Sequence, residues 1–177
     1  MYCAIMGDII KSREIIEGRG ETQERFKSAI KNINDKYANS IKSNFTIMAG
    51  DGFYGLINSC ENLLNIILEI RLAIAPNQIR IGIGIGSIDT KIEKNNSELI
   101  DGRANSTAKE AIDYLSQNEK KYESVYRTTF LKVDSRNYDK LLEVYEKKYS
   151  DSPETGIDAV KKCEKYEKFI NTIFCAC

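Results

Sequence analysis

The alternation of apolar and polar residues predicts strands at several points of the chain. Residues 2–8 form a short, mostly apolar run that is typical of a buried central strand. Residues 78–87 alternate strictly, which is the period of a strand, and place Arg80 and three glycines opposite Ile79, Ile81, Ile83 and Ile85. A face made of glycine lets another backbone or a ligand approach closely, and of the two we expect close packing of a helix. Residues 124–133 predict a further strand.

Helical periodicity accounts for most of the remaining chain. Residues 21–39 carry an amphipathic stripe made of Phe26, Ile30, Ile33 and Tyr37. Residues 62–75 are apolar over a wide arc, which predicts a well-buried helix. Residues 101–115 have an apolar stripe whose smallest members lie at the N-terminal end, where the helix would sit tightly on the sheet. Two Lys- and Glu-rich amphipathic segments follow, residues 138–149 and 156–174. A loop is expected at residues 15–20, and a loop or short edge ribbon at residues 89–99.

Residues 45–57 predict a β-hairpin with a carboxylate at its tip. Two strand-forming runs flank residues 49–52 (Ala-Gly-Asp-Gly), and Asp-Gly between such runs is a strong hairpin signal. One interpretation is that Asp51 merely tolerates the turn conformation while Gly52 supplies a positive φ. The other is that Asp51 belongs to a functional site.

The order of the predicted elements indicates the fold. Strand-helix-strand-strand-helix-strand is the ferredoxin-like βαββαβ arrangement, an α+β antiparallel sheet with helices packed on it. We expect a palm domain over residues 1–135 and a helical extension over residues 136–177. Right-handed crossovers place the first strand in the middle of the sheet, antiparallel to the third. The end of the first strand and the start of the third then bring Asp8 and Asp51 together.

Composition narrows the chemistry. Among the 177 residues, Lys plus Arg and Asp plus Glu both total 26, so no net charge recruits nucleic acid or an anionic membrane. The chain has no histidine, which excludes Ser-His and Cys-His nucleophile pairs and histidine-containing zinc sites. Any metal must be held by carboxylates and carbonyls, which suits Mg²⁺, Mn²⁺ or Ca²⁺.

Cysteine content and hydropathy indicate a cytoplasmic protein. An odd count of five cysteines, unevenly spaced and without a signal peptide, favours reduced thiols. Cys175 and Cys177 would form only half of a metal site, because no second pair completes it. The most apolar stretch, Leu63 to Ile74, is too short and too polar to span a bilayer, which needs ~20 apolar residues.

Two neighbouring carboxylates need a positive partner. Asp8 and Asp51 would repel each other unless a positive group lies between them. With no histidine and no nearby arginine to pair with them in the sequence, a divalent cation is the simplest answer. Lys11, Ser12 and Arg13, together with free backbone N–H groups after the strand, would then hold phosphates that the cation bridges. The alternative is that Asp8 caps a helix or turn ahead of a solvated charge run.

The helix over residues 101–115 carries a second pair of polar residues. Asn105 and Lys109 are four residues apart, so they share a face and would point at the same object. The alternative is that both simply face solvent.

With these residues in place, residues 1–133 resemble the nucleotidyl-cyclase superfamily of palm domains. Residues 49–53 (Ala-Gly-Asp-Gly-Phe) resemble the GGDEF signature of diguanylate cyclases and the Gly-Asp-Gly-Phe hairpin of some class III adenylate cyclases. Residues 7–10 (Gly-Asp-Ile-Ile) are similar to the first metal-binding strand of both, and residues 104–109 are similar to the Ala-x-x-x-Ala-Lys helix of the GGDEF group. Residues 1–13 and the Gly-Asp-x-Phe-x-Gly-Leu hairpin look most like the SatD family.

The resemblance implies a site for a nucleoside triphosphate with Mg²⁺ or Mn²⁺. Asp8, the Ile9 carbonyl and Asp51 would hold the cations, while Gly50 and the loop from Ile10 to Arg13 would cradle the triphosphate. Lys109 would contact phosphate, in this superfamily usually across a dimer of two chains, and Asn105 would act on the transition state.

The chain also departs from these families at three positions. Gly52 replaces the glutamate of GGDEF enzymes, and Ile47 replaces the base-selecting lysine of class III cyclases. Gly102 lies three residues before Asn105, whereas the class III pattern has four.

Three functions therefore remain open. The first is a nucleotidyl cyclase, in which a ribose 3′-oxygen attacks the α-phosphorus beside two metals. The second is a regulatory module that binds a nucleoside triphosphate and contacts a protein partner through the helices after residue 134. The third is a structural or protein-interaction domain without a ligand. The missing glutamate and lysine favour the second, and nucleic acid and membrane partners are not expected.

Overall fold

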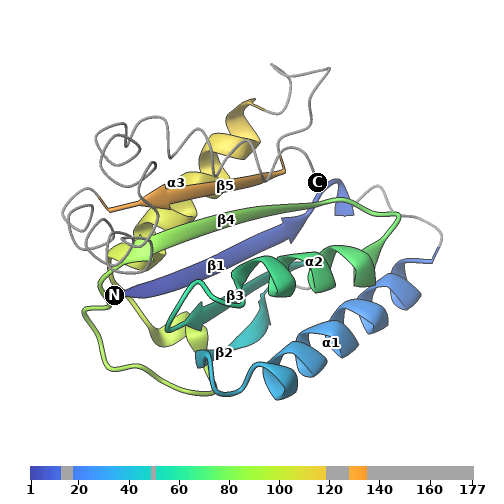
Figure 1. Cartoon of the computed structure of the whole chain (residues 1–177). Coiled ribbons are helices and arrows are strands. Elements are labelled where there is room, and N and C mark those ends of the chain that lie inside the picture. The colour runs from blue at the N-terminus through green and yellow to red at the C-terminus, as the bar shows by residue number, and fades with distance from the viewer. Residues whose placement is uncertain (13–17, 49–50, 119–127, 135–177) are drawn as a thin grey trace, which may run out of the picture.

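The computed structural model describes residues 1–12, 18–48, 51–118 and 128–134 (Figure 1). Its elements, in chain order, are β1 (Tyr2–Ile9), α1 (Arg19–Lys36), β2 (Ile41–Met48), β3 (Gly52–Ile57), α2 (Leu63–Ile74), β4 (Ile79–Gly86), the 3-10 turn η2 (Ser97–Leu99), α3 (Arg103–Asn118) and β5 (Thr129–Val133). Arg13, Gly50, Cys175, Cys177 and the proposed helical extension over residues 136–177 lie outside the described residues.

The sheet has the predicted topology, and the further strand predicted within residues 124–133 is its fifth strand, β5. Its order is β2-β3-β1-β4-β5, and β1 in the middle pairs antiparallel with both β3 and β4. The first four strands with α1 and α2 form the ferredoxin-like arrangement, which confirms the predicted fold class. Strand β5 follows α3 and pairs parallel with β4. In Figure 1, α1 and α2 cover one face of the sheet and α3 covers the other.

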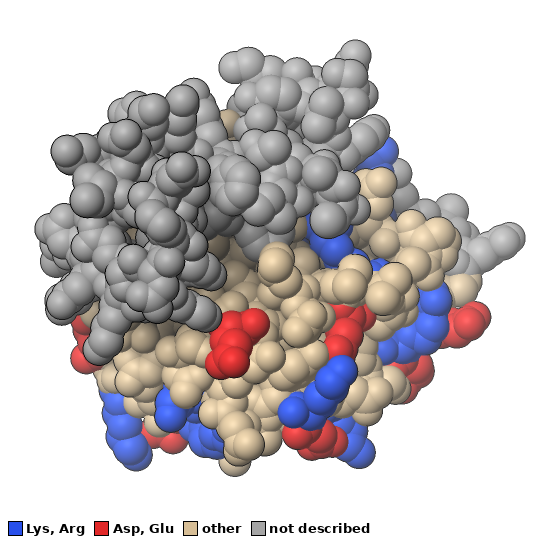
Figure 2. Space-filling model, viewed as in Figure 1, with Lys and Arg blue, Asp and Glu red and all other residues tan. Residues whose placement is uncertain are grey.

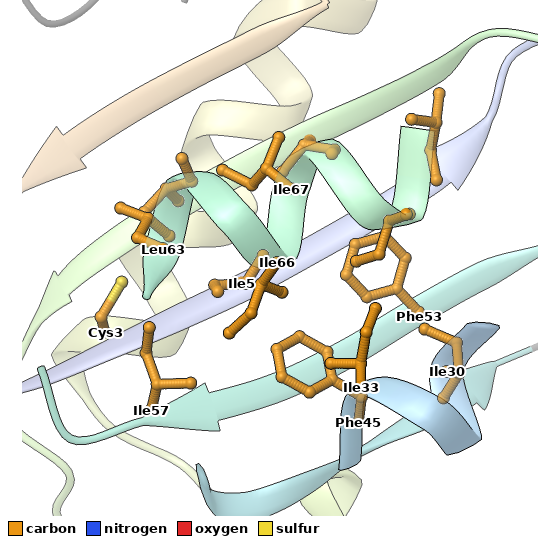
Figure 3. Packing of buried hydrophobic residues seen from close by; sticks show 14 of the residues in the cluster. Cys3, Ile5, Ile30, Ile33, Phe45, Phe53, Ile57, Leu63, Ile66 and Ile67 are labelled. Carbon is orange, nitrogen blue, oxygen red and sulfur yellow. The ribbon is translucent and has the colours of Figure 1, made fainter. Parts of the chain in front are cut away.

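The main core lies between the sheet and the pair α1 and α2 (Figure 3). Strand alternation sends the four isoleucines of β4 to this face, where they are buried. Three aromatic rings fill the space beneath α1. The rings of Phe53 and Phe26 meet edge-on, with centroids 6.1 Å apart, and the centroids of Phe53 and Phe45 are 6.0 Å apart. The predicted stripe of α1 is the one that faces this core, because Phe26, Ile30 and Ile33 are buried.

Helix α3 packs on the glycine face of β4, as the alternation predicted. A Cβ atom added to Gly84 would collide with backbone atoms of Ala104 and Ala108, and one added to Gly82 would collide with the Ala108 carbonyl oxygen. The contacts follow in reverse order along the two elements, so α3 runs antiparallel to β4. Glycine on β4, facing the small alanines of α3, permits so close an approach.

Element boundaries differ from the predictions by a few residues. Helix α1 was expected over residues 21–39, but it begins at Arg19, directly after Gly18, whose φ of 71° stops the helix from extending backwards. It ends at Lys36, because Tyr37 leaves the helical conformation with a φ of -106° and a ψ of 23°. The Tyr37 carbonyl accepts from the backbone N–H groups of Ser40 and Ile41 in the turn that leads into β2.

None of the helices in the described part of the chain is both long enough and apolar enough to cross a membrane.

Candidate functional site

The end of β1 lies between the hairpin and the start of β4. Asp8 is in register with Gly52 of β3 on one side and with Arg80 of β4 on the other. The backbone N–H of Ile9 donates to the carbonyl of Asp51 at 3.0 Å. The structure therefore brings Asp8 and Asp51 to neighbouring positions at one edge of the sheet, as the topology predicted.

Arginine 80 supplies the positive partner that the sequence analysis did not find for Asp8. Its Nε donates to one carboxylate oxygen at 3.1 Å and its Nη2 donates to the other at 3.0 Å. The Asp8 side chain is 36% exposed and that of Arg80 is 15% exposed, so solvent still reaches the carboxylate. A two-point ion pair of this geometry is among the stronger polar contacts in proteins. The sequence analysis missed Arg80 although it recorded the signal, a single charged residue among glycines on one strand face.

Asp51 also has a partner from within the chain. The hydroxyl of Ser12 donates to the Asp51 carboxylate. Ser12 was expected to contact phosphate, but in this structure it ties the segment after β1 to the hairpin. Both carboxylates are thus held by protein donors, an arginine for Asp8 and a hydroxyl for Asp51.

The loop after β1 has fewer free amides than the sequence suggested. The backbone N–H of Ile10 donates to the Gln78 carbonyl at 2.8 Å, and that of Ile9 is used by Asp51. Lys11 is exposed and adopts a φ of 53°, a left-handed conformation that is uncommon for a lysine. Of the predicted phosphate-binding loop, this backbone turn at Lys11 and Ser12 is the part positioned at the sheet edge.

Asn105 takes a structural place in α3. It is buried, its amide nitrogen donates to the Ile100 carbonyl, and its amide oxygen accepts from the hydroxyl of Tyr54. Burial raises the pKa of Tyr54 well above the ordinary tyrosine value, the hydrogen bond to Asn105 lowers it in part, and the charge of Asp101 raises it. The expected role of Asn105 at a transition state gains no support from this geometry, because both ends of its amide are used internally.

Lys109 is exposed on the part of α3 that is nearer to the site. Because α3 runs antiparallel to β4, residues after Ala108 lie toward Gly82 and Arg80, whereas Ala104 lies toward Gly86. The described residues show no hydrogen bond or ion pair from Lys109 to either aspartate. The predicted face shared by Asn105 and Lys109 is thus divided, one residue facing inward and the other outward.

The oxygen donors available at this edge suit a hard divalent cation. Within the described ranges, no three Asp, Glu or Cys side chains gather closely enough to form a metal cluster. Two carboxylates from adjacent strands are present, and carboxylate oxygens are preferred ligands of Mg²⁺ and Mn²⁺. A cation would have to displace Arg80 from Asp8 and Ser12 from Asp51.

The fold and this edge define the chain as a ferredoxin-like α+β palm domain with two aspartates on adjacent strand ends. A family model described as the SatD family matches residues 2–148, and the chain belongs to that family. A comparison with curated proteins finds no match.

Solved structures of similar shape include cyclase and GGDEF domains. A bacterial light-regulated adenylyl cyclase is 13% identical with a TM-score of 0.49, over 73% of this chain and 74% of that one. The guanylate cyclase domain of RhGC from Catenaria anguillulae, in complex with GTP, is 15% identical with a TM-score of 0.45, over 63% and 71%. An EAL/GGDEF domain protein from M. capsulatus is 15% identical with a TM-score of 0.38, over 68% and 78%.

Proposed function

We propose that this chain is a domain that binds a nucleoside triphosphate together with Mg²⁺ or Mn²⁺, and that its role is regulatory or weakly catalytic. The observation that carries the proposal is the hydrogen bond from the Ile9 N–H to the Asp51 carbonyl, which sets Asp8 and Asp51 side by side. The cation would be held by these two carboxylates and the Ile9 carbonyl. Its charge would relieve the repulsion between the two acids.

The surrounding groups suit a triphosphate. When a cation displaces Arg80 from Asp8, the guanidinium would stay beside the site and form paired hydrogen bonds to phosphate oxygens. Lys11, Ser12, Arg13 and Gly50 would line the phosphate chain from the two loops, with Lys109 approaching from α3. The burial of Asn105 and the glycine after Asp51 remove two groups that catalysis would use, which is why we favour binding over rapid turnover.

Two alternatives remain. An active nucleotidyl cyclase would use the same site to form a cyclic or linked product. A domain without a ligand is favoured by one observation, the pairing of Asp8 with Arg80 and of Asp51 with Ser12, since each carboxylate is satisfied without a cation.

Calorimetry and mass spectrometry on the same samples separate these functions. The full chain is titrated with ATP and with GTP, each with and without Mn²⁺, and the mixtures are analysed for cyclic or linked nucleotides. We expect cation-dependent binding that Asp8→Asn abolishes, with little or no product. The control Asp35→Asn changes an exposed aspartate on α1, on the opposite sheet face, and should bind like the wild type.

Three results would decide against the proposal as stated. Rapid product formation would identify an enzyme, and absence of binding by the folded wild type would identify a domain without a nucleotide. Equal binding by Asp8→Asn would place the nucleotide elsewhere. Thermal unfolding of each variant shows whether lost binding is only lost folding.

A further inference from the structure

Helix α2 carries a row of exposed leucines on the side away from the sheet. Leu64, Leu68 and Leu72 are 54%, 52% and 66% exposed, while the opposite side of the helix is buried in the core. A spacing of four residues aligns them along one side of the helix. We call these three residues the leucine row. Figure 2 shows a largely uncharged surface over α2, in contrast to the charged side chains over α1. Single exposed leucines are ordinary, but an aligned row indicates a docking surface.

A groove between α1 and α2 continues the leucine row. Its volume is about 670 Å³, and Leu72 belongs to both features. Glu21, Glu24, Arg25 and Glu69 also line the groove, so its walls are partly charged. Burial of apolar surface would drive docking along the leucine row itself.

The last described residues lie at the same end of the sheet as the start of α2, three strands away from the strand that precedes it. Val133 of β5 is in register with Ile85, Ile85 with Cys3, and Cys3 with Ile57, which precedes α2 by a short turn. The residues after Asp134 thus continue from the end of the sheet at which α2 begins. Residues 135–155, fully extended, span on the order of 70 Å, enough to reach any point of the leucine row.

The segment over residues 156–174 has a pattern that matches the row. Steps of four and three residues, which fit one helical face, separate five of its nine apolar residues: Ala159, Cys163, Tyr166, Ile170 and Ile173. The earlier amphipathic segment, residues 138–149, begins too soon after Asp134. The three residues 135–137, which separate Asp134 from this segment, span about 10 Å. To reach the outer side of α2 they would have to span more than the ~10–12 Å diameter of that helix.

A second copy of the chain is a weaker candidate for the same surface. Stable interfaces bury roughly 800 Å² per partner with about 20–30 residues a side, and three leucines beside one groove offer much less. A segment tethered to the same chain needs less contact, because its effective concentration is on the order of millimolar.

We propose that residues 156–174 form an amphipathic helix that docks in cis on Leu64, Leu68 and Leu72 of α2 and on the adjoining groove. The apolar face of the segment covers the leucine row, and its lysines and acids remain in solvent. This docking is independent of the proposed nucleotide site, which lies on the other sheet face.

Hydrogen exchange of the full chain tests the proposal. Mass spectrometry follows the amides of residues 159–173 in the wild type, in Leu68→Asp/Leu72→Asp, and in the control Leu99→Asp. Leu99 is 64% exposed in η2, outside the leucine row, so its change adds a single carboxylate to a different exposed leucine position. We expect slow exchange in the wild type and the control, and exchange at least about tenfold faster in the double variant, because a carboxylate cannot be buried against an apolar helix.

Two outcomes would overturn the proposal. Equal exchange in all three proteins would show that the segment does not dock on the leucine row. Protection that increases with protein concentration, together with a dimer in sedimentation that the double variant loses, would assign the row to a second copy. The rate at which Cys163 is alkylated, in protein that thermal unfolding shows to be folded, gives an independent measure of docking. We expect slow alkylation in the wild type, where the segment is docked, and fast alkylation in the double variant.

Discussion

The carboxylate of Asp8 is clamped by the guanidinium of Arg80 through two hydrogen bonds, at 3.1 and 3.0 Å, across 72 positions of the chain. The pair sits on adjacent strands at the same edge that carries Asp51. Any cation that binds Asp8 competes with this arginine, and any phosphate that follows the cation meets it. Arg80 is therefore expected to weaken the binding of a cation alone and to strengthen the binding of a cation–nucleotide complex.

Substitution Arg80→Gln should separate these two effects. Without the guanidinium, Asp8 is free, so Mn²⁺ alone should bind more tightly, while the Mn²⁺–triphosphate complex should bind more weakly. Hydrogen bonds to charged groups contribute about 1.5–3 kcal/mol, which corresponds to roughly tenfold or more in affinity. Calorimetry measures both. Arg19→Gln, an exposed change on α1, is the control, and an unchanged Mn²⁺ affinity in Arg80→Gln would refute the competition.

Substitution Asn105→Ala should affect folding and not binding. It leaves the Tyr54 hydroxyl and the Ile100 carbonyl without their partner in a buried place, which costs about 1–3 kcal/mol of unfolding free energy. Urea denaturation gives the stability, and calorimetry gives the nucleotide affinity of the folded fraction. A folded variant of normal stability that no longer binds nucleotide would restore the role in the site that the sequence suggested.

The glycine face of β4 should not tolerate a methyl group. In Gly84→Ala the new Cβ meets the backbone of α3, so the helix must shift, and overpacking of this kind costs about 1–3 kcal/mol. Gly20→Ala is the matched control, because no atom lies near its Cβ position and the residue is within α1. There alanine should stabilise by roughly 0.5–1 kcal/mol. Denaturant midpoints of the two variants should move in opposite directions.

Tyr54 should make the protein sensitive to alkali. Burial holds its pKa above the ordinary value of 10.0 in the folded state, so above pH 10.0 the unfolded chain releases this proton and the folded chain keeps it. The contribution of Tyr54 to stability is complete below pH 10.0 and declines as the pH rises beyond it.

The measurement compares wild type with Tyr54→Phe, which lacks the group. The stability advantage of the wild type over Tyr54→Phe, from thermal unfolding between pH 8 and 11, should be constant at first and then shrink. A constant advantage through the whole range would contradict a buried, protonated Tyr54.

Local periodicity in the sequence was sufficient for the elements and for much of the packing. The alternation of residues 78–87 predicted both the buried isoleucines and the glycine face on which α3 packs, because successive side chains of a strand point to opposite faces. The order of elements, with the right-handed rule for crossovers, was enough to place the ends of β1 and β3 together.

The partners of individual polar groups were decided only by the tertiary structure. The sequence placed Asp8 and Asp51 side by side but gave neither one a protein partner, and it presented Asn105 and Lys109 as one polar face. Strand register brought Arg80 to Asp8, the turn after β1 brought Ser12 to Asp51, and the position of α3 over the sheet buried Asn105 while leaving Lys109 in solvent. Such contacts join residues far apart in the chain. They depend on strand register and on the rotation of a helix about its axis, and local sequence patterns determine neither.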